Sequence, residues 1–150
     1  MSLLSLAARR LLIVDDNAAH AHLIQLYLRR LSFGLKVDWV EDGDEALTLL
    51  AGLDGDSDQH PPDLILLDLH MRRLDGFEVL EHLRNHPRLS AIPVLAMSNL
   101  ENERDKQRAC ELGADGYLVK PMDLAQWQDV MGSVVSLLAT PNRLPQACVA

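Results

Sequence analysis

The sequence lacks most features that mark secreted, membrane-bound or nucleic-acid-binding proteins. Its 150 residues include only two cysteines, Cys110 and Cys148, without metal-site spacing, which favours reduced thiols over a disulfide framework. No run approaches the ~20 apolar residues that a membrane span needs. With 14 basic against 22 acidic residues and a net charge of -8, no basic run attracts nucleic acid or anionic membrane. These absences predict a cytoplasmic protein that binds neither nucleic acid nor membranes.

The composition otherwise predicts one folded domain. Hydrophobic residues make up 48% and charged residues 24% of the chain, an ordinary balance for a globular protein with a sizeable core. Residues 1–8 lack the early positive charge of a signal peptide, because Arg9 and Arg10 follow the short apolar stretch. We therefore expect a short extension at residues 1–8, one domain at residues 9–140 and a tail at residues 141–150.

Short apolar runs alternate with segments of helical periodicity, which is typical of an α/β protein with a parallel sheet. The alternation of Lys36–Val40 predicts an exposed edge strand, and a polar loop at residues 52–62 precedes the third strand. Asp123 is the expected N-cap of the last helix, which Pro141 ends. The predicted strands are residues 10–14, 36–40, 63–67, 92–97 and 116–119, and the predicted helices begin near residues 18, 44, 77, 101 and 124.

Polar side chains follow the predicted strands where each strand ends. Asp15 and Asp16 follow the first strand, Asp68 the third, Ser98 the fourth and Lys120 the fifth. Ligands of open parallel sheets bind beyond the carboxyl ends of the strands, so these side chains are expected to converge. Three carboxylates suit Mg²⁺, which also takes phosphate oxygens, and a lysine and a hydroxyl suit phosphoryl oxygens. The set predicts phosphoryl transfer onto a carboxylate.

Five motifs in order and spacing resemble a response-regulator receiver domain of two-component signalling over about residues 9–138. None is decisive alone, but the set is specific. The motifs are Leu11-Leu12-Ile13-Val14-Asp15-Asp16-Asn17, Leu64-Ile65-Leu66-Leu67-Asp68-Leu69, Asp75-Gly76, Met97-Ser98-Asn99 and Gly113-Ala114-Asp115-Gly116-Tyr117-Leu118-Val119-Lys120-Pro121. The resemblance implies a flavodoxin-like, doubly wound, five-stranded parallel sheet of strand order 2-1-3-4-5, with helices on both faces.

The same resemblance implies residue roles and partners. Asp68 is the expected phosphoacceptor for a histidine kinase, in a signalling protein rather than a dedicated enzyme. Mg²⁺ is expected on Asp68, on Asp16 directly, on Asp15 through water and on the backbone carbonyl of His70. The residues expected to contact the phosphoryl group are Lys120 and Ser98, and those expected to couple it to a shift of the fourth and fifth strands are Ser98 and Tyr117.

Three positions depart from the usual family pattern. Arg72 stands where the family usually has proline, which leaves the loop beyond Asp68 freer and adds a charge that attracts a partner or donor. Asn99 stands where a small residue is usual, which narrows access to Asp68. Leu100 occupies a position that, together with that of His70, tunes phosphoryl lifetime in relatives, and an apolar side chain cannot orient an attacking water. We therefore expect a comparatively long-lived phosphorylated form.

A narrower resemblance concerns the segment from His60 to Leu69 and the tail Asn142-Arg143-Leu144-Pro145. Both look like the short, stand-alone regulators paired with phytochrome histidine kinases, which are often homodimers. This resemblance implies a bacteriophytochrome kinase as phosphodonor, light as the upstream signal and a homodimer as the assembly. The downstream partner is not indicated.

Three other functions remain to be weighed. Arg72 and Asn99 are compatible with an interaction module that works without phosphorylation. A Mg²⁺-dependent phosphatase with an aspartyl intermediate typically has a second acid two residues after its nucleophile, where this chain has His70. A DNA-binding regulator is disfavoured, because nothing after the last predicted helix can fold into an output domain.

Overall fold

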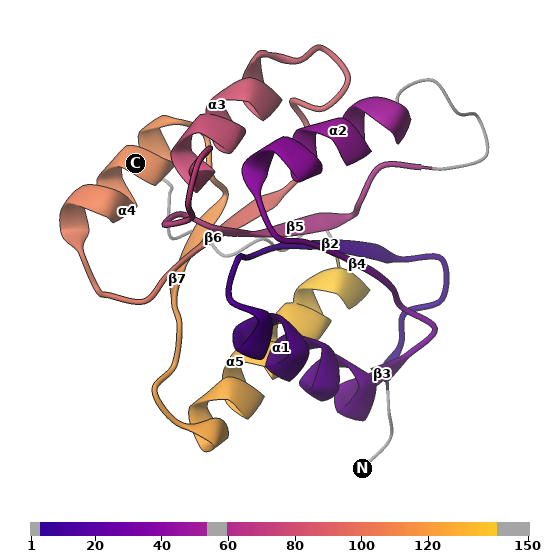
Figure 1. Cartoon of the computed structure of the whole chain (residues 1–150). Coiled ribbons are helices and arrows are strands. Elements are labelled where there is room, and N and C mark those ends of the chain that lie inside the picture. The colour runs from indigo at the N-terminus through magenta and orange to yellow at the C-terminus, as the bar shows by residue number, and fades with distance from the viewer. Residues whose placement is uncertain (1–3, 54–59, 141–150) are drawn as a thin grey trace.

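A parallel sheet with the strand order β4-β2-β5-β6-β7 forms the centre of the molecule. The computed structural model describes residues 4–53 and 60–140 (Figure 1). The strands of this sheet are β2 (Arg10–Val14), β4 (Lys36–Val40), β5 (Leu64–Asp68), β6 (Val94–Ser98) and β7 (Gly116–Val119). The helices are α1 (Ala18–Leu31), α2 (Gly43–Leu53), α3 (Gly76–Asn85), α4 (Glu103–Glu111) and α5 (Leu124–Ala139). Counting only these five strands, the predicted order 2-1-3-4-5 is confirmed.

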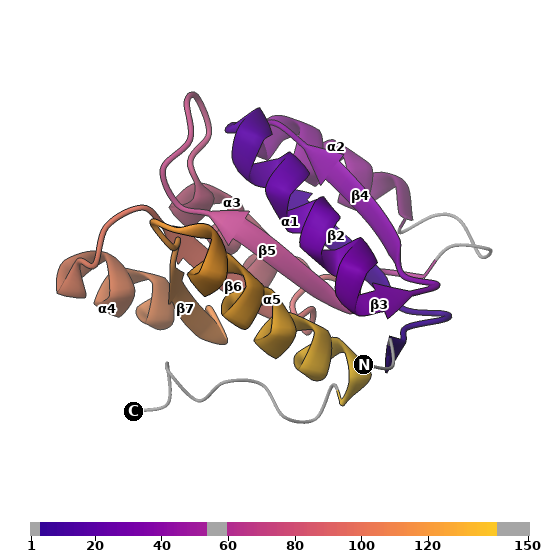
Figure 2. The same ribbon diagram turned by 90° about the horizontal axis from the view of Figure 1, so that it is seen from below.

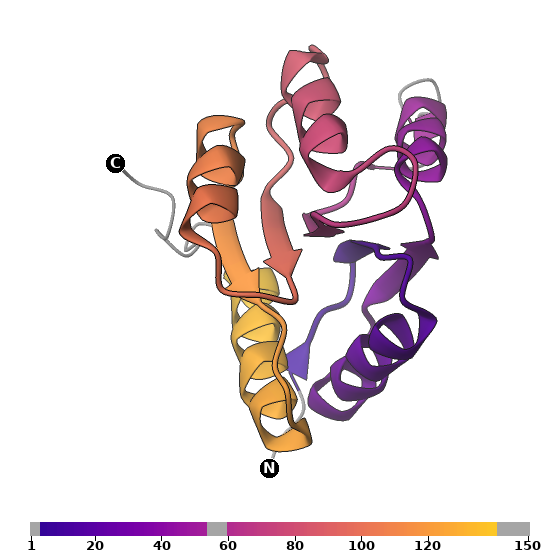
Figure 3. The same ribbon diagram turned by 60° about the vertical axis from the view of Figure 1, so that its left-hand side comes forward.

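The five helices cover both faces of the sheet, because side chains alternate along each strand. Leu12 and Val14 of β2 pack in a cluster with α2 and α3, while Leu11 and Ile13 pack in a cluster with α1 and α5. Figure 2 shows α1 and α5 side by side on one face, and Figure 3 shows α2, α3 and α4 on the other. The doubly wound arrangement predicted from the sequence is therefore confirmed.

The element boundaries differ from the prediction by a few residues. Strand β4 lies at the sheet edge with β2 as its neighbour, as its alternating sequence predicted. Strand β6 starts two residues later than expected, because Pro93 has no N–H to donate to the sheet. Asp123 caps α5 as expected, and its carboxylate accepts a hydrogen bond from the Gln126 N–H at 2.8 Å.

A separate two-stranded pairing was not predicted. Strand β1 (Leu4–Ser5) runs parallel to β3 (Ser32–Phe33), and Leu6 is buried beside α1 and α5. Strands of two residues show no alternation, so the sequence carried no signal for them. Residues 54–59 of the expected polar loop and the expected tail at residues 141–150 lie outside the described residues.

One expectation from composition is wrong. Cys110 on α4 is disulfide-bonded in the structure, whereas the sparse cysteines had predicted reduced thiols. Across the described residues, no helix is both long and apolar enough to cross a membrane.

Candidate functional site

Three carboxylates meet at the carboxyl ends of the two central strands. Asp15 follows β2 directly, Asp68 is the last residue of β5, and the two strands pair up to Val14 opposite Leu67. With Asp16, they offer ligand oxygens that all lie within 4.8 Å of one another. Asp15 and Asp68 are buried, whereas Asp16 is exposed, so the cluster is open on one side.

This donor set fits a hard divalent cation. All three groups are oxygen ligands, and three carboxylates this close repel one another unless a cation or a proton lies between them. The exposed Asp16 side leaves room for water and phosphoryl oxygens, which Mg²⁺ retains in most protein sites. His70 follows at the loop after β5, and its backbone N–H donates to Asp68 Oδ1 at 3.1 Å. That hydrogen bond orients the Asp68 carboxylate.

The Lys120 ammonium contacts two carboxylates of the same cluster, although Lys120 lies far from both in the sequence. Its Nζ donates to Asp15 Oδ2 at 2.7 Å and lies 3.5 Å from Asp68 Oδ2. The backbone N–H of Lys120 donates to the Ser98 carbonyl at 2.7 Å, which fixes the start of the loop after β7. Since the Lys120 residue is only 3% exposed, its ammonium depends on these carboxylates for compensation.

Burial and neighbouring charges set the protonation of Asp68. Burial, the largest effect, raises the pKa of Asp68 to about 6 from an ordinary 3.8. Lys120 and the His70 N–H act in the opposite direction and lower this pKa, whereas the Asp15 carboxylate raises it. At neutral pH the group is therefore mostly ionised and able to act as a nucleophile.

Ser98 and Tyr117 meet at a backbone carbonyl rather than at the carboxylates. The Ser98 hydroxyl donates to the Leu100 carbonyl at 3.1 Å and accepts from the Leu100 N–H at 3.3 Å. The Tyr117 hydroxyl donates to the same Leu100 carbonyl at 3.0 Å. The structure thus joins the two residues expected to act as a switch, and Ser98 shares the sheet edge with Asp68 without a hydrogen bond to it.

Of the three departing positions, Arg72 lies next to the carboxylate cluster, and Asn99 and Leu100 lie exposed in the loop after β6. The Arg72 N–H lies 3.4 Å from Asp16 Oδ2, and Arg72 borders a hollow of about 460 Å³ next to the cluster. Leu100 is 72% exposed, and Asn99 is also exposed. The residues lining the hollow are Asp16, Asn17, Glu41, Asp42, Arg72 and Arg73.

His20 belongs to the site but was missed by sequence reasoning. Its Nδ1 lies 3.1 Å from Lys120 Nζ, and its ring lies 5.8 Å from the Trp127 ring. In the sequence, His20 and His22 are two residues apart and do not share a helix face, so no metal-binding role was predicted for His20. Its place one helical turn after Asp16 is the signal that could have found it.

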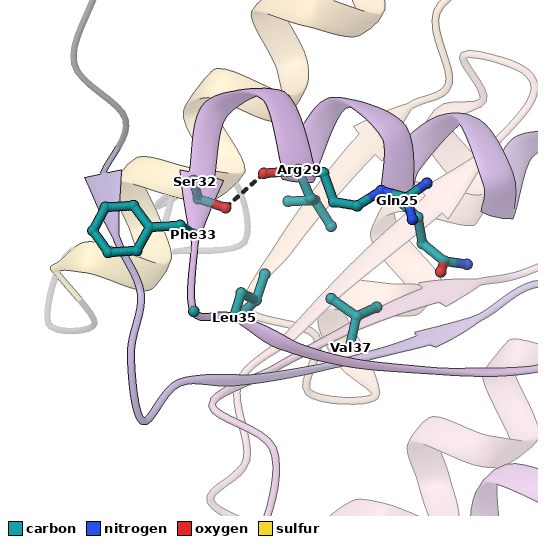
Figure 4. A pocket seen from close by; sticks show the side chains of 8 residues that line it. Gln25, Arg29, Ser32, Phe33, Leu35 and Val37 are labelled. Carbon is teal, nitrogen blue, oxygen red and sulfur yellow. Dashed lines mark hydrogen bonds between the residues drawn. The ribbon is translucent and has the colours of Figure 1, made fainter.

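A second hollow of about 270 Å³ lies at the opposite edge of the sheet, between α1 and β4 (Figure 4). Leu35 and Val37 form part of its apolar wall, and Gln25 and Arg29 extend along α1. None of its lining residues is acidic. The chemistry predicted for the protein therefore belongs to the carboxylate cluster and not to this hollow.

Comparison with protein families matches residues 11–131 to the response regulator receiver domain. The chain therefore belongs to the receiver family of two-component response regulators. It is 33% identical over 135 residues to the probable methanogenesis regulatory protein FilR2 of Methanothrix harundinacea, covering 90% of this chain and 86% of that protein. Against the next three curated relatives, all transcriptional regulators, the chain spans only about half of their length.

Solved structures of response regulators share the fold. The phosphorylated cyanobacterial phytochrome response regulator RcpA matches with a TM-score of 0.82 and 32% identity, covering 93% of this chain and 99% of RcpA. The Mn²⁺-bound response regulator Rcp1 matches with a TM-score of 0.79 and 29% identity, covering 91% and 99%. Rcp1 is described as a Mn²⁺-bound form, and in this chain Asp15, Asp16 and Asp68 form an acidic cluster that could hold a divalent ion.

Proposed function

We propose that this protein is a single-domain response regulator that accepts a phosphoryl group on Asp68 from a histidine kinase, with Mg²⁺ as cofactor. The observation that carries the proposal is the buried Asp68 beside two further carboxylates, with Lys120 Nζ 3.5 Å from its Oδ2. The receiver extends over residues 9–140, flanked by an extension and a tail. The protein acts as a cytoplasmic phosphoacceptor rather than as a dedicated enzyme.

Each residue of the cluster has one task in the transfer. A carboxylate oxygen of Asp68 attacks the phosphorus of a phosphohistidine; the P–N bond breaks, and its electron pair leaves with the imidazole, which is then protonated. The Lys120 ammonium exchanges its contact with the Asp68 carboxylate for a hydrogen bond that it donates to a phosphoryl oxygen. Asp16, Asp68 and the His70 carbonyl would hold Mg²⁺, with Asp15 acting through water. The metal, when bound, neutralises negative charge on the phosphoryl oxygens.

Signalling follows from the hydrogen bonds at Leu100. A phosphoryl group on Asp68 offers the Ser98 hydroxyl a stronger, charged acceptor than the Leu100 carbonyl that it contacts now. Once Ser98 turns away, the Leu100 carbonyl keeps only the Tyr117 hydroxyl, so the β6–α4 loop and Tyr117 change position together. The changed surface of α4 and β7 then alters binding to a downstream partner or to a second copy of this chain.

The phosphodonor that we propose is a phytochrome histidine kinase. RcpA is described as a phytochrome response regulator, and its similarity to this chain extends over 99% of its length. The assembly that we propose is a homodimer, as the resemblance to short regulators paired with phytochrome kinases implies. The gene beside the one for this protein tests the pairing: a histidine kinase with a photosensory domain there supports it, and a kinase with an unrelated sensor domain contradicts it.

The acceptor assignment is tested with the variant Asp68→Asn. Wild-type protein incubated with Mg²⁺ and radiolabelled acetyl phosphate is expected to take up label, and Asp68→Asn is expected to take up none. Asp44→Asn, an exposed carboxylate change on α2, is the matched control and should label like wild type. Label on Asp68→Asn would show that Asp68 is not the acceptor. No label on any protein, without Mg²⁺ binding, would favour the phosphorylation-independent interaction module.

A further inference from the structure

The ammonium of Lys120 has three acceptors around it. Two are the carboxylates of Asp15 and Asp68, at 2.7 and 3.5 Å, and the third is His20 Nδ1 at 3.1 Å. An ammonium group carries three N–H donors and no acceptor, so the three partners match its donors one to one. His20 is the one uncharged partner of the three.

The position of His20 is determined by α1 and α5 together. Its backbone N–H donates to Asn17 Oδ1 at 3.0 Å, in the cap that starts α1. Its ring packs against Trp127 of α5, with ring centroids 5.8 Å apart, and the residue is partly buried. The cap of α1 and Trp127 of α5 thus hold the imidazole next to the Lys120 ammonium.

The contact with Lys120 determines the tautomer of His20. Since the ammonium can only donate, Nδ1 must carry a lone pair, and the proton of the neutral ring lies on Nε2. Burial lowers the pKa of His20 and the Lys120 charge lowers it further, while the Asp15 carboxylate raises it. The charged groups that face the ring are therefore Lys120 and Asp15, and α5 contributes the uncharged Trp127.

We propose that His20 is a positioning residue for Lys120, holding its ammonium between Asp15 and Asp68 so that it can reach an incoming phosphoryl oxygen. The proposal rests on the function proposed above. Lysine has a flexible four-carbon stem, and without a third acceptor its ammonium is free to move fully onto Asp15. A neutral acceptor fixes the stem without competing for the divalent metal, which the carboxylates bind.

The test compares three variants in phosphorylation by acetyl phosphate with Mg²⁺. His20→Leu removes the acceptor and is expected to slow labelling of Asp68 about fivefold to tenfold, the fold-change that corresponds to the net contribution of one ordinary hydrogen bond. His20→Asn places Oδ1 where Nδ1 was and is expected to restore most of the rate. His22→Leu is the control, because His22 lies on the same helix as His20 but packs its ring against Trp39 of β4, while the contacts of the Lys120 ammonium are with Asp15, His20 and Asp68.

The pH profile separates positioning from a general structural role. As pH falls below the pKa of His20, the protonated ring no longer accepts from Lys120 and repels it, whereas asparagine does not titrate. The ratio of the His20→Asn rate to the wild-type rate is therefore expected to rise toward acidic pH. A ratio independent of pH, or a His20→Leu rate equal to wild type, would overturn the proposal.

A measurement on wild-type protein covers the case in which His20→Leu fails to fold. Nitrogen NMR of the imidazole at neutral pH should show an unprotonated Nδ1 and a protonated Nε2, and a protonated Nδ1 would overturn the proposal. If the wild-type protein takes up no label at all, the proposed function fails. If Asp68 is labelled and His20→Leu is labelled equally fast, only the role of His20 fails.

Discussion

The buried carboxylate of Asp68 makes the stability of this protein depend on pH. Its carboxylate is buried beside Asp15, and burial raises its pKa to about 6. A folded state that binds this proton more tightly than the unfolded chain is most stable below the unfolded pKa, near 4. The free energy of unfolding of the metal-free protein therefore falls as pH rises from about 4 through about 6.

Asp68→Asn is expected to remove that pH dependence, because asparagine is a close neutral replacement for the protonated acid. In chelator at neutral pH, the variant should gain roughly 1–3 kcal/mol in free energy of unfolding, and the gain should vanish near pH 4. Urea denaturation at several pH values measures this. Asp16→Asn, at an exposed carboxylate, is the control and should change little. Parallel pH curves for Asp68→Asn and wild type would contradict the expectation.

Leu100 is the residue at which phosphoryl lifetime can be tested. Its side chain is 72% exposed at the loop after β6 and has no group that can orient a water. Leu100→Glu is expected to shorten the lifetime of the phosphorylated form about threefold to tenfold, a small part of what a well-placed general base contributes. The decay of label after removal of the phosphodonor measures it. An unchanged decay rate would show that Leu100 does not govern the lifetime.

At the scale of elements, the start of α3 is packed against the strand that ends on Asp68. Asp75 caps this helix in a capping box with Glu78, and the Gly76 N–H donates to the Leu69 carbonyl at 3.1 Å. A Cβ on Gly76 would overlap the Asp68 carbonyl and lie 2.7 Å from Leu69 Cα. The glycine of the Asp75-Gly76 motif is thus required by close backbone approach and not by backbone conformation.

Gly76→Ala is expected to destabilise the protein by about 1–3 kcal/mol, because the backbone beside Asp68 must shift to admit the methyl group. Labelling of Asp68 should slow as well. Gly132→Ala is a matched control in α5, where nothing lies within 4 Å of the added Cβ, and it should stabilise by about 0.5–1 kcal/mol. The two melting temperatures measure the difference, and a stabilising Gly76→Ala would contradict the packing argument.

At the scale of the whole molecule, the site depends on contacts between distant parts of the chain. Lys120 lies 105 residues from Asp15 and 52 from Asp68, yet it meets both. The Tyr27 hydroxyl donates to the Leu124 carbonyl at 3.1 Å, which ties α1 to the start of α5, beside the loop of Lys120. Anything that binds the assembled site therefore stabilises the whole fold.

Mg²⁺ is expected to raise the melting temperature at neutral pH, with a stabilisation of about 2.7 kcal/mol at one hundred times its dissociation constant. The increase should shrink as pH falls below about 6, because protons compete for Asp68. Chelator should reverse it, and Asp16→Asn should reduce it. Differential scanning fluorimetry measures all three, and a Mg²⁺ effect that is the same at pH 5 and pH 8 would contradict carboxylate binding.

The order of strands and helices along the chain and the sheet edge at which the carboxylates gather were predictable from the apolar runs before Asp15, Asp68, Ser98 and Lys120, because strand ends in a parallel sheet share one edge. The order of the strands within the sheet was implied by the resemblance to receiver domains. The pairing of β1 with β3 carried no such signal, because strands of two residues show no alternation. It depends on which surfaces the folded domain brings together.

The sequence by itself determined which chemical groups stand at the strand ends, since apolar periodicity and the residues that interrupt it are local properties. Only the tertiary structure decided which of these groups meet. It brought His20 to Lys120, turned the Ser98 hydroxyl toward the Leu100 carbonyl and buried Asp68 deeply enough to raise its pKa. Such contacts depend on how α1 and α5 pack on the sheet and on the side-chain rotamers that this packing selects.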